Sequence, residues 1–169
     1  WWGGGDEFSM FSVARYTHDN PSYRVISDRQ NFDFDFGFNN GHMQKWRLRE
    51  WVTNIANGKD TLFHLHSANI NSSDQANTFY HGTQVGTVNS NGAHDTDYTP
   101  RQIQFGGNGT SNGYSKCEVA EFIAFNRVLS TTERQEIESY LAHKWGLSST
   151  LPNGHTGKAN PPGIGTGLS

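Results

Sequence analysis

Two acidic residues alternate with phenylalanines in the segment 31–38, NFDFDFGF. In a strand, Asp33 and Asp35 share one face and lie about 6.6 Å apart, because each residue advances the chain by about 3.3 Å. Retaining glycoside hydrolases hold two carboxyl groups at about 5–5.5 Å, so this spacing permits such chemistry. However, Asn31 and Gly37 occupy the neighbouring positions of that face and add no third carboxylate. We therefore predict two acids on a solvent-wetted sheet face, and a protein that is not an enzyme.

A second pair of acids, Asp95 and Asp97, belongs to the polar segment 90–100. Calcium binds six to eight oxygen atoms, which loops commonly supply. A spacing of two within a loop can present both carboxylates to one ion, so these residues are the candidate metal ligands and calcium is the candidate cofactor. The alternative is a pair of solvated turn acids without a cofactor.

The nitrogen and sulfur ligands of transition metals give weaker patterns. His64 and His66 share one face of a predicted strand, a spacing compatible with zinc or copper, but no third ligand is indicated nearby. We predict that this pair holds no metal. Cys117 is the only cysteine, which excludes an internal disulfide and a cysteine-based zinc site, and we predict a buried thiol.

Aromatic residues next to amide-rich segments could bind sugars, because sugar C–H faces pack on aromatic rings while amides bind hydroxyl groups. Most aromatic residues of a small β-sandwich belong to its core, and we assign Tyr140 and Trp145 to the core. The candidate ligand-binding residues are Trp46, Trp51, Tyr80 and Tyr98.

Short strands separated by turn residues dominate the chain, whose 169 residues include 19 glycines and 13% aromatic residues. The predicted strands are 8–16, 23–27, 31–38, 42–48, 51–53, 61–68, the two arms of a hairpin over 78–88 turning at Gly82-Thr83, 101–105 and 117–126. The net charge of −3 comes with no basic face, so nucleic acid is not an expected partner. No apolar run approaches the roughly 20 residues that span a bilayer.

One helix is predicted over residues 131–145. Ser130 and Glu133 have the spacing of a capping box. An apolar stripe follows, and Gly146 is typical of a helix end. Strands plus one short C-terminal helix indicate a mainly β protein: an antiparallel two-sheet β-sandwich (jelly roll).

The segment 120–127, AEFIAFNR, together with Leu129-Ser130, Glu133-Arg134 and 140–147, YLAHKWGL, resembles the closing motif of laminin G-like domains. These belong to the concanavalin A-like lectin/glucanase superfamily. The segment 8–15 resembles an early strand of that fold, and Asp35–Phe38 with Trp51-Val52 resembles its middle. Hydrolases of the superfamily carry Glu-x-Asp-x-x-Glu on one strand, and both glutamates are absent around Asp33 and Asp35.

The resemblance implies a jelly-roll domain over residues 1–151, lacking its first strands, followed by a Gly/Pro-rich linker or surface strap over 152–169. It also implies a non-catalytic recognition or adhesion module that binds a glycan or a protein surface, within a larger extracellular, cell-surface or virion-surface polypeptide. Two alternatives remain: a structural or decoration module of a virion or surface filament, and a glycoside hydrolase.

Overall fold

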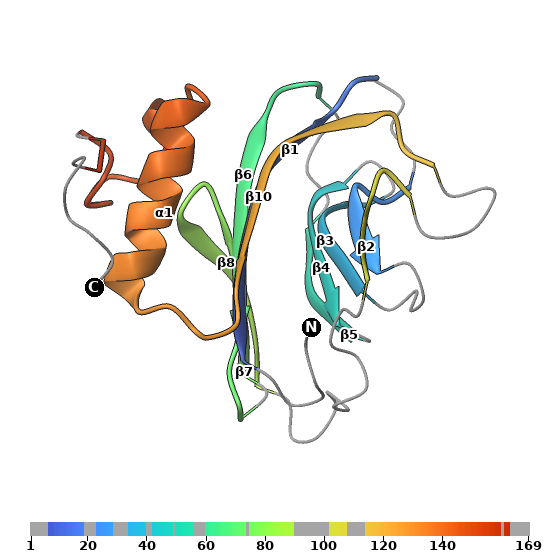
Figure 1. The fold of residues 1–169 in the computed structure, drawn as a ribbon, viewed down its shortest axis with the longest axis horizontal. Helices are drawn as coiled ribbons and strands as arrows, with labels where there is room; N and C mark the ends of the chain where they lie inside the picture. The colour runs from blue at the N-terminus through green and yellow to red at the C-terminus, as the bar shows by residue number, and fades with distance from the viewer. Residues whose placement is uncertain are drawn as a thin grey trace.

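The part of the chain that the structure describes folds into two antiparallel β-sheets and one α-helix, which confirms the predicted β-sandwich (Figure 1). The computed structural model describes residues 7–18, 23–28, 34–39, 42–48, 50–55, 60–73, 75–89, 102–107, 114–159 and 161–162. Asp33 lies outside these residues.

Within these described residues, each sheet has five strands. Sheet A has the order β10-β1-β6-β7-β8. Its strands are β1 (Phe8–Tyr16), β6 (His64–Ile70), β7 (Gln75–Tyr80), β8 (Thr83–Asn89) and β10 (Cys117–Phe125). Sheet B has the order β5-β4-β3-β2-β9. Its strands are β2 (Ile26–Asp28), β3 (Phe34–Asn39), β4 (His42–Leu48), β5 (Glu50–Ile55) and β9 (Ile103–Phe105).

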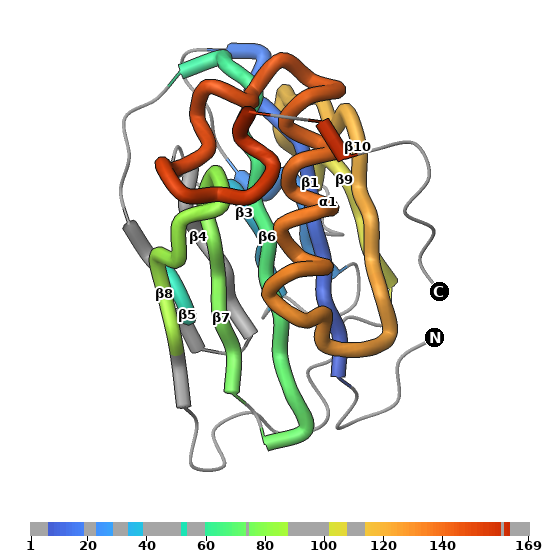
Figure 2. The backbone as a smooth tube through the Cα atoms, turned by 90° about the vertical axis from the view of Figure 1, so that its left-hand side faces the viewer, coloured from blue at the N-terminus to red at the C-terminus, as the bar shows by residue number. Residues whose placement is uncertain are grey.

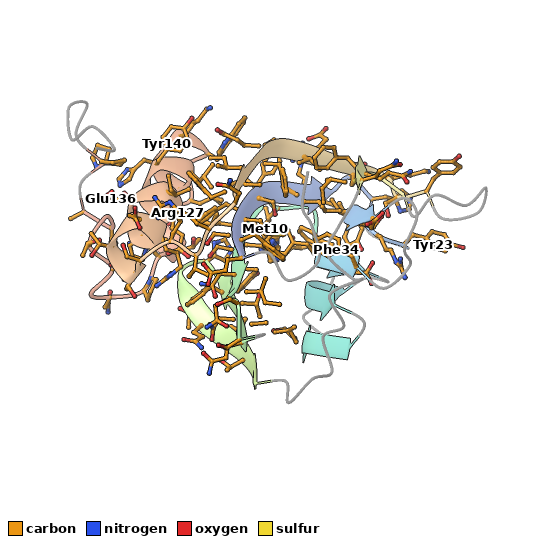
Figure 3. All side chains as sticks on the ribbon, turned by 60° about the horizontal axis from the view of Figure 1, so that its bottom comes forward. Met10, Tyr23, Phe34, Arg127, Glu136 and Tyr140 are labelled. Atoms are coloured by element: carbon orange, nitrogen blue, oxygen red, sulfur yellow. The ribbon has the colours of Figure 1, made fainter. Side chains whose placement is uncertain are left out.

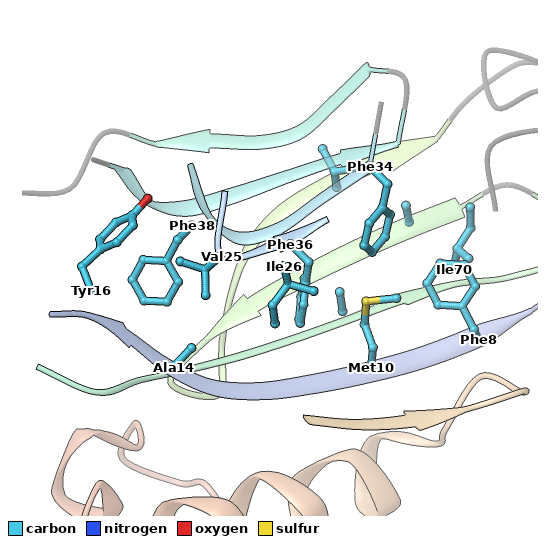
Figure 4. Packing of buried hydrophobic residues seen from close by; sticks show 13 residues of the cluster. Phe8, Met10, Ala14, Tyr16, Val25, Ile26, Phe34, Phe36, Phe38 and Ile70 are labelled. Atoms are coloured by element: carbon cyan, nitrogen blue, oxygen red, sulfur yellow. The ribbon is translucent and has the colours of Figure 1, made fainter. Parts of the chain in front are cut away.

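The main core lies between the two sheets (Figure 4). Phe34, Phe36 and Phe38 all point into it with at most 1% exposure, as their period of two predicts. Met10 and Phe8 face them from β1. Burial of such side chains stabilises the fold by roughly 1.5–3 kcal/mol each.

The prediction that Asp35 lies on a wetted face is wrong. Asp35 is fully buried, and Arg24 Nε approaches its Oδ1 to 2.6 Å. Ser27, which pairs with Asp35, is also fully buried, and its Oγ donates a hydrogen bond to the Gly107 carbonyl. Alternation therefore identified the two strand faces correctly, but the chain buries both.

Helix α1 (Thr131–Lys144) packs on the outer face of sheet A (Figure 1). Its N-terminus has the predicted capping box: the Glu133 N–H donates to Ser130 Oγ at 3.3 Å, and the Ser130 N–H donates to Glu133 Oε2 at 2.8 Å. At the other end Gly146 has φ +71°, and the Leu147 N–H donates to the Ala142 carbonyl. Backbone groups at both ends of the helix thus find hydrogen-bond partners in neighbouring residues, as the sequence indicated.

The face that α1 buries is partly polar. Leu141 and Ala142 pack in a second apolar cluster with Leu65 of β6, but Glu138 is also fully buried. Tyr140, which the sequence assigned to the core, is 37% exposed on the helix (Figure 3). Its hydroxyl instead donates to Glu121 Oε1.

Glu138 is the centre of a buried hydrogen-bond network. Arg134 Nη1 donates to both carboxylate oxygens, at 2.7 and 2.5 Å, and Ser67 Oγ of β6 donates to Oε1. His155 Nε2 lies 3.1 Å from Oε2. The Arg134 guanidinium also stacks over the Phe79 ring at 3.9 Å. The network joins the helix, sheet A and the segment after the helix.

The segment after α1 crosses the ends of β6, β7 and β8 (Figure 2). It includes the 3₁₀ helix η2 (Ser148–Thr150), and Leu151 and His155 are buried. The Gly157 carbonyl accepts a hydrogen bond from Ser139 Oγ. The described residues 152–159 therefore lie as a strap on α1, whereas the domain boundary at residue 151 stays a prediction.

Candidate ligand-binding site

An open groove of about 650 Å³ separates the edges of the two sheets on one side of the sandwich. One wall is β9, the edge strand of sheet B, and the other is β10, the edge strand of sheet A. Among the described residues, β10 pairs only with β1 and β9 only with β2. Edge strands present unpaired backbone N–H and C=O groups, so both walls can offer hydrogen-bonding groups to a ligand.

A β-bulge decides which side chains of β10 face this groove. Val13 is paired with Glu121 but the next residue, Ala14, is paired with Val119, so Ala120 is an extra residue on β10. A bulge places two consecutive side chains on the same face of a strand. As a result Glu121 points to the helix side, where it meets Trp145, and Phe122 turns inward to the groove.

The floor and rim of the groove are aromatic. Phe105 is 50% exposed and packs edge-on against Phe122, with ring centroids 5.6 Å apart and an interplanar angle of 68°. The Ser115 N–H donates to the Gly106 carbonyl at 2.9 Å and fixes the two ends of the intervening loop. The arrangement can bind an apolar face and several hydroxyl groups together.

Two ionisable residues, Cys117 and Glu121, belong to the part of β10 that lines the groove, and the Glu121 carboxylate faces the helix side. Cys117 is partly exposed rather than buried as predicted, and burial together with Glu118 raises the pKa of its thiol. Burial also opposes ionisation of Glu121. Hydrogen bonds from Lys144, Trp145 and Tyr140 outweigh that effect and hold the Glu121 pKa below its ordinary value. The thiol beside the groove is therefore protonated at neutral pH, and the Glu121 carboxylate is ionised on the helix side.

The sequence-predicted site residues do not line this groove in the described part of the chain. Asp95, Asp97 and Tyr98 lie outside the described residues, as do the side chains of Trp46 in β4 and Trp51 in β5. The assignment of these five residues to ligand or calcium binding stays a prediction.

Tyr80 is the remaining candidate, and it lies among histidines instead. Its ring stacks on His64, with centroids 5.6 Å apart and an interplanar angle of 19°, and its hydroxyl lies 2.6 Å from His64 Nδ1. Burial, with a contribution from Asp60, raises the pKa of Tyr80 to about 12. One ring face and the hydroxyl are thus engaged within the protein. His64 and His66 are neighbours on β6, as predicted, and both are buried.

Sequence reasoning did not predict that Phe105 and Phe122 line this groove. Phe105 ends a strand just before two glycines, which is a signal that its ring could lie at a rim. No sequence pattern indicated the direction of the Phe122 side chain, because that direction depends on the bulge at Ala120.

Comparison with solved structures shows the fold that this chain shares. The W1252A mutant of HCR D/C VPI 5995 matches with a TM-score of 0.55 and 12% identity, over 81% of this chain and 37% of that chain. A structure described as "Cell entry of botulinum neurotoxin type C is dependent upon interaction with two ganglioside molecules" has a TM-score of 0.56 and 12% identity, over 80% of this chain and 36% of that one.

A smaller neighbour is the CBM40 of Ruminococcus gnavus IT-sialidase, bound to alpha2,3 sialyllactose. It has a TM-score of 0.52 and 15% identity, over 76% of this chain and 80% of that chain. This chain thus spans little more than a third of the toxin chains but most of the CBM40. No family model and no curated protein matches the sequence. The structural likeness shows a shared β-sandwich fold, and the more specific laminin G-like assignment stays a prediction.

Proposed function

We propose that the protein is a non-catalytic recognition module that binds a glycan in the groove between β9 and β10. The observation that carries this proposal is the half-exposed Phe105, held edge-on against Phe122 inside an open groove. A sugar ring can pack its C–H face on Phe105 while its hydroxyl groups pair with the edge-strand backbone. The neighbours described as bound to sialyllactose, or dependent on gangliosides, support a glycan as the ligand class.

The environment of Asp35 supports a binding role over hydrolysis. Its carboxylate is fully buried against Arg24, so it does not reach a substrate on an open sheet face. Among the described residues no helix is long and apolar enough to cross a membrane. An extracellular or surface location, within a larger polypeptide, belongs to the same proposal.

Binding to a glycan array, followed by titration with the best ligand, tests the proposal. We expect Phe105→Ala to weaken binding at least about tenfold, which corresponds to a loss of about 1.4 kcal/mol. Leu62→Ala removes another exposed apolar side chain, 66% exposed and outside the groove, and should bind as the wild type does. Equal affinities of the wild type and Phe105→Ala would contradict the proposed groove.

Calcium at Asp95 and Asp97 is a separate part of this proposal. If the ion supports glycan binding, EDTA abolishes the array signal and added calcium, rather than zinc, restores it. Binding that is unaffected by EDTA would remove calcium from the proposal.

A structural module within a larger assembly is the second candidate. It is favoured by β10, a nine-residue edge strand with apolar residues on both faces. Such an edge can pair with a strand of another chain. Sedimentation of the isolated chain at increasing concentration tests this role, and a monomer at all concentrations would count against self-assembly.

A further inference from the structure

The cluster around Tyr80 contains two histidines whose ring nitrogens face each other. His64 Nδ1, from β6, and His81 Nε2, from the β7–β8 turn, are 3.3 Å apart. His64 is 5% exposed and His81 is 9% exposed, whereas Tyr80 beside them is only partly buried. The pair therefore lies just below the surface.

Hydrogen bonds on the far side of each ring assign the tautomers. His64 Nε2 lies 2.9 Å from Asp60 Oδ1, and a carboxylate can only accept, so Nε2 carries the proton. Thr150 Oγ1 donates to the Leu147 carbonyl and lies 2.7 Å from His81 Nδ1, so it accepts from an Nδ1–H group. In the neutral pair, both facing nitrogens are thus acceptors. The Tyr80 hydroxyl, 2.6 Å from His64 Nδ1, donates its hydrogen to that nitrogen, so an ion bound by the pair takes the place of this hydrogen bond.

We propose that His64 Nδ1 and His81 Nε2 bind a transition-metal ion of the Zn²⁺, Co²⁺ or Cu²⁺ type, with water in the remaining positions. Zn–N bonds of about 2.0–2.1 Å in a tetrahedral arrangement place two nitrogens about 3.3–3.4 Å apart, as these atoms are. Metal-binding histidines typically donate their second N–H to a carboxylate or another oxygen. Here Asp60 accepts from His64, and Thr150 accepts from His81. Among the described residues no group of three His, Cys, Asp or Glu side chains forms a metal site, so the ion would keep open positions next to the Tyr80 hydroxyl.

The backbone at His81 gives an independent indication. His81 has φ +47° and Gly82 has φ +77°, which is the pattern of a tight hairpin turn with two left-handed residues. Asn-Gly is the preferred pair for such a turn, and a residue other than glycine with positive φ is uncommon. Histidine in place of the better turn-former places an imidazole opposite His64.

This turn also provides the test, because His81→Asn removes the imidazole and keeps a favourable turn residue. Calorimetric titration of the untagged chain with Zn²⁺, and the visible d–d absorption of added Co²⁺, measure binding. The wild type should bind one ion per chain with nitrogen-type Co²⁺ bands, whereas Mg²⁺ should not bind. His81→Asn, which keeps a favourable turn residue, should remain folded and bind Zn²⁺ at least tenfold more weakly.

Two further variants make the test specific. Asp60→Asn leaves both ligands in place but removes the carboxylate that orients His64, and should weaken binding about 10- to 100-fold. His18→Asn removes an exposed histidine elsewhere and should leave the affinity unchanged. The proposal is overturned if the wild type binds no ion, or if His81→Asn and Asp60→Asn both bind Zn²⁺ as tightly as the wild type.

Discussion

Single buried polar residues connect parts of this molecule that are far apart in the sequence. Glu138 lies under α1 with no exposed surface, and its two oxygens accept hydrogen bonds from Arg134, Ser67 and His155. A buried charge lowers stability unless it is paired or hydrogen-bonded, and these three side chains supply such partners to the carboxylate. Removal of any member leaves the others buried without compensation.

We expect Glu138→Ala to destabilise the protein by about 3–5 kcal/mol, because the Arg134 guanidinium stays near-buried without its carboxylate. Urea unfolding measures the change. Glu136→Ala is the matched control, since it removes a partly exposed glutamate from the same helix (Figure 3). Similar losses in the two variants would show that the buried network contributes little.

At the scale of the element, α1 is defined by its ends more than by its apolar stripe. The capping box at Ser130 is reinforced by Arg127, whose guanidinium donates two hydrogen bonds to Glu133 at 3.0 and 2.6 Å. Hydrogen bonds from Arg127, and then from Ser130, lower the pKa of Glu133 to about 2 from its ordinary 4.5.

This shift makes a pH-dependent contribution to stability. The folded state holds the Glu133 proton less tightly than the unfolded state, so the contribution is complete above pH 4.5 and disappears as the pH falls towards 2. Glu133→Gln keeps a side chain that can complete the capping box but does not titrate. We expect its melting temperature to fall less steeply than that of the wild type between pH 5 and 2. Parallel pH profiles would contradict this origin of the acid sensitivity.

At the scale of the whole molecule, the two sides of the sandwich, where the edges of the sheets lie, differ in how closely the sheets approach. Sheets A and B approach each other where β5 contacts β7 and β8, but on the opposite side β9 and β10 leave the groove open. The strap after α1 closes neither side. It crosses the outer end of sheet A, where His155 reaches Glu138 and Thr150 reaches His81 (Figure 2).

Truncation tests how much of the chain this domain needs. A chain that ends at residue 151 loses the His155 contact with Glu138 and the Gly157 carbonyl that accepts from Ser139. We expect a loss of at least about 3 kcal/mol, seen as a melting temperature lower by about 6 to 12 °C. A chain that ends at residue 159 keeps both contacts and should melt like the full chain. If the 1–151 chain melts unchanged, the domain ends at residue 151 as the sequence predicted.

Local sequence patterns were enough to predict most elements. Alternating phenylalanines in 31–38 marked a core strand, and Ser130 with Glu133 marked the start of the helix, because side-chain period and capping act over a few residues. The same reasoning placed His64 and His66 on one face. Local patterns could not predict which residues pack against that face.

Only the tertiary structure shows which residues come together in the candidate sites. Phe122 reaches the groove because one extra residue, Ala120, interrupts the pairing of β10 with β1, and periodicity does not reveal a bulge. His81 meets His64 because the start of the β7–β8 turn continues the pairing with β6, where the His81 N–H donates to the Leu65 carbonyl. The sequence by itself determined which segments become strands and helix, since local backbone and side-chain preferences govern these. Contacts between residues distant in the chain depend on how the finished elements pack, so only the folded molecule brings the groove and the paired imidazoles together.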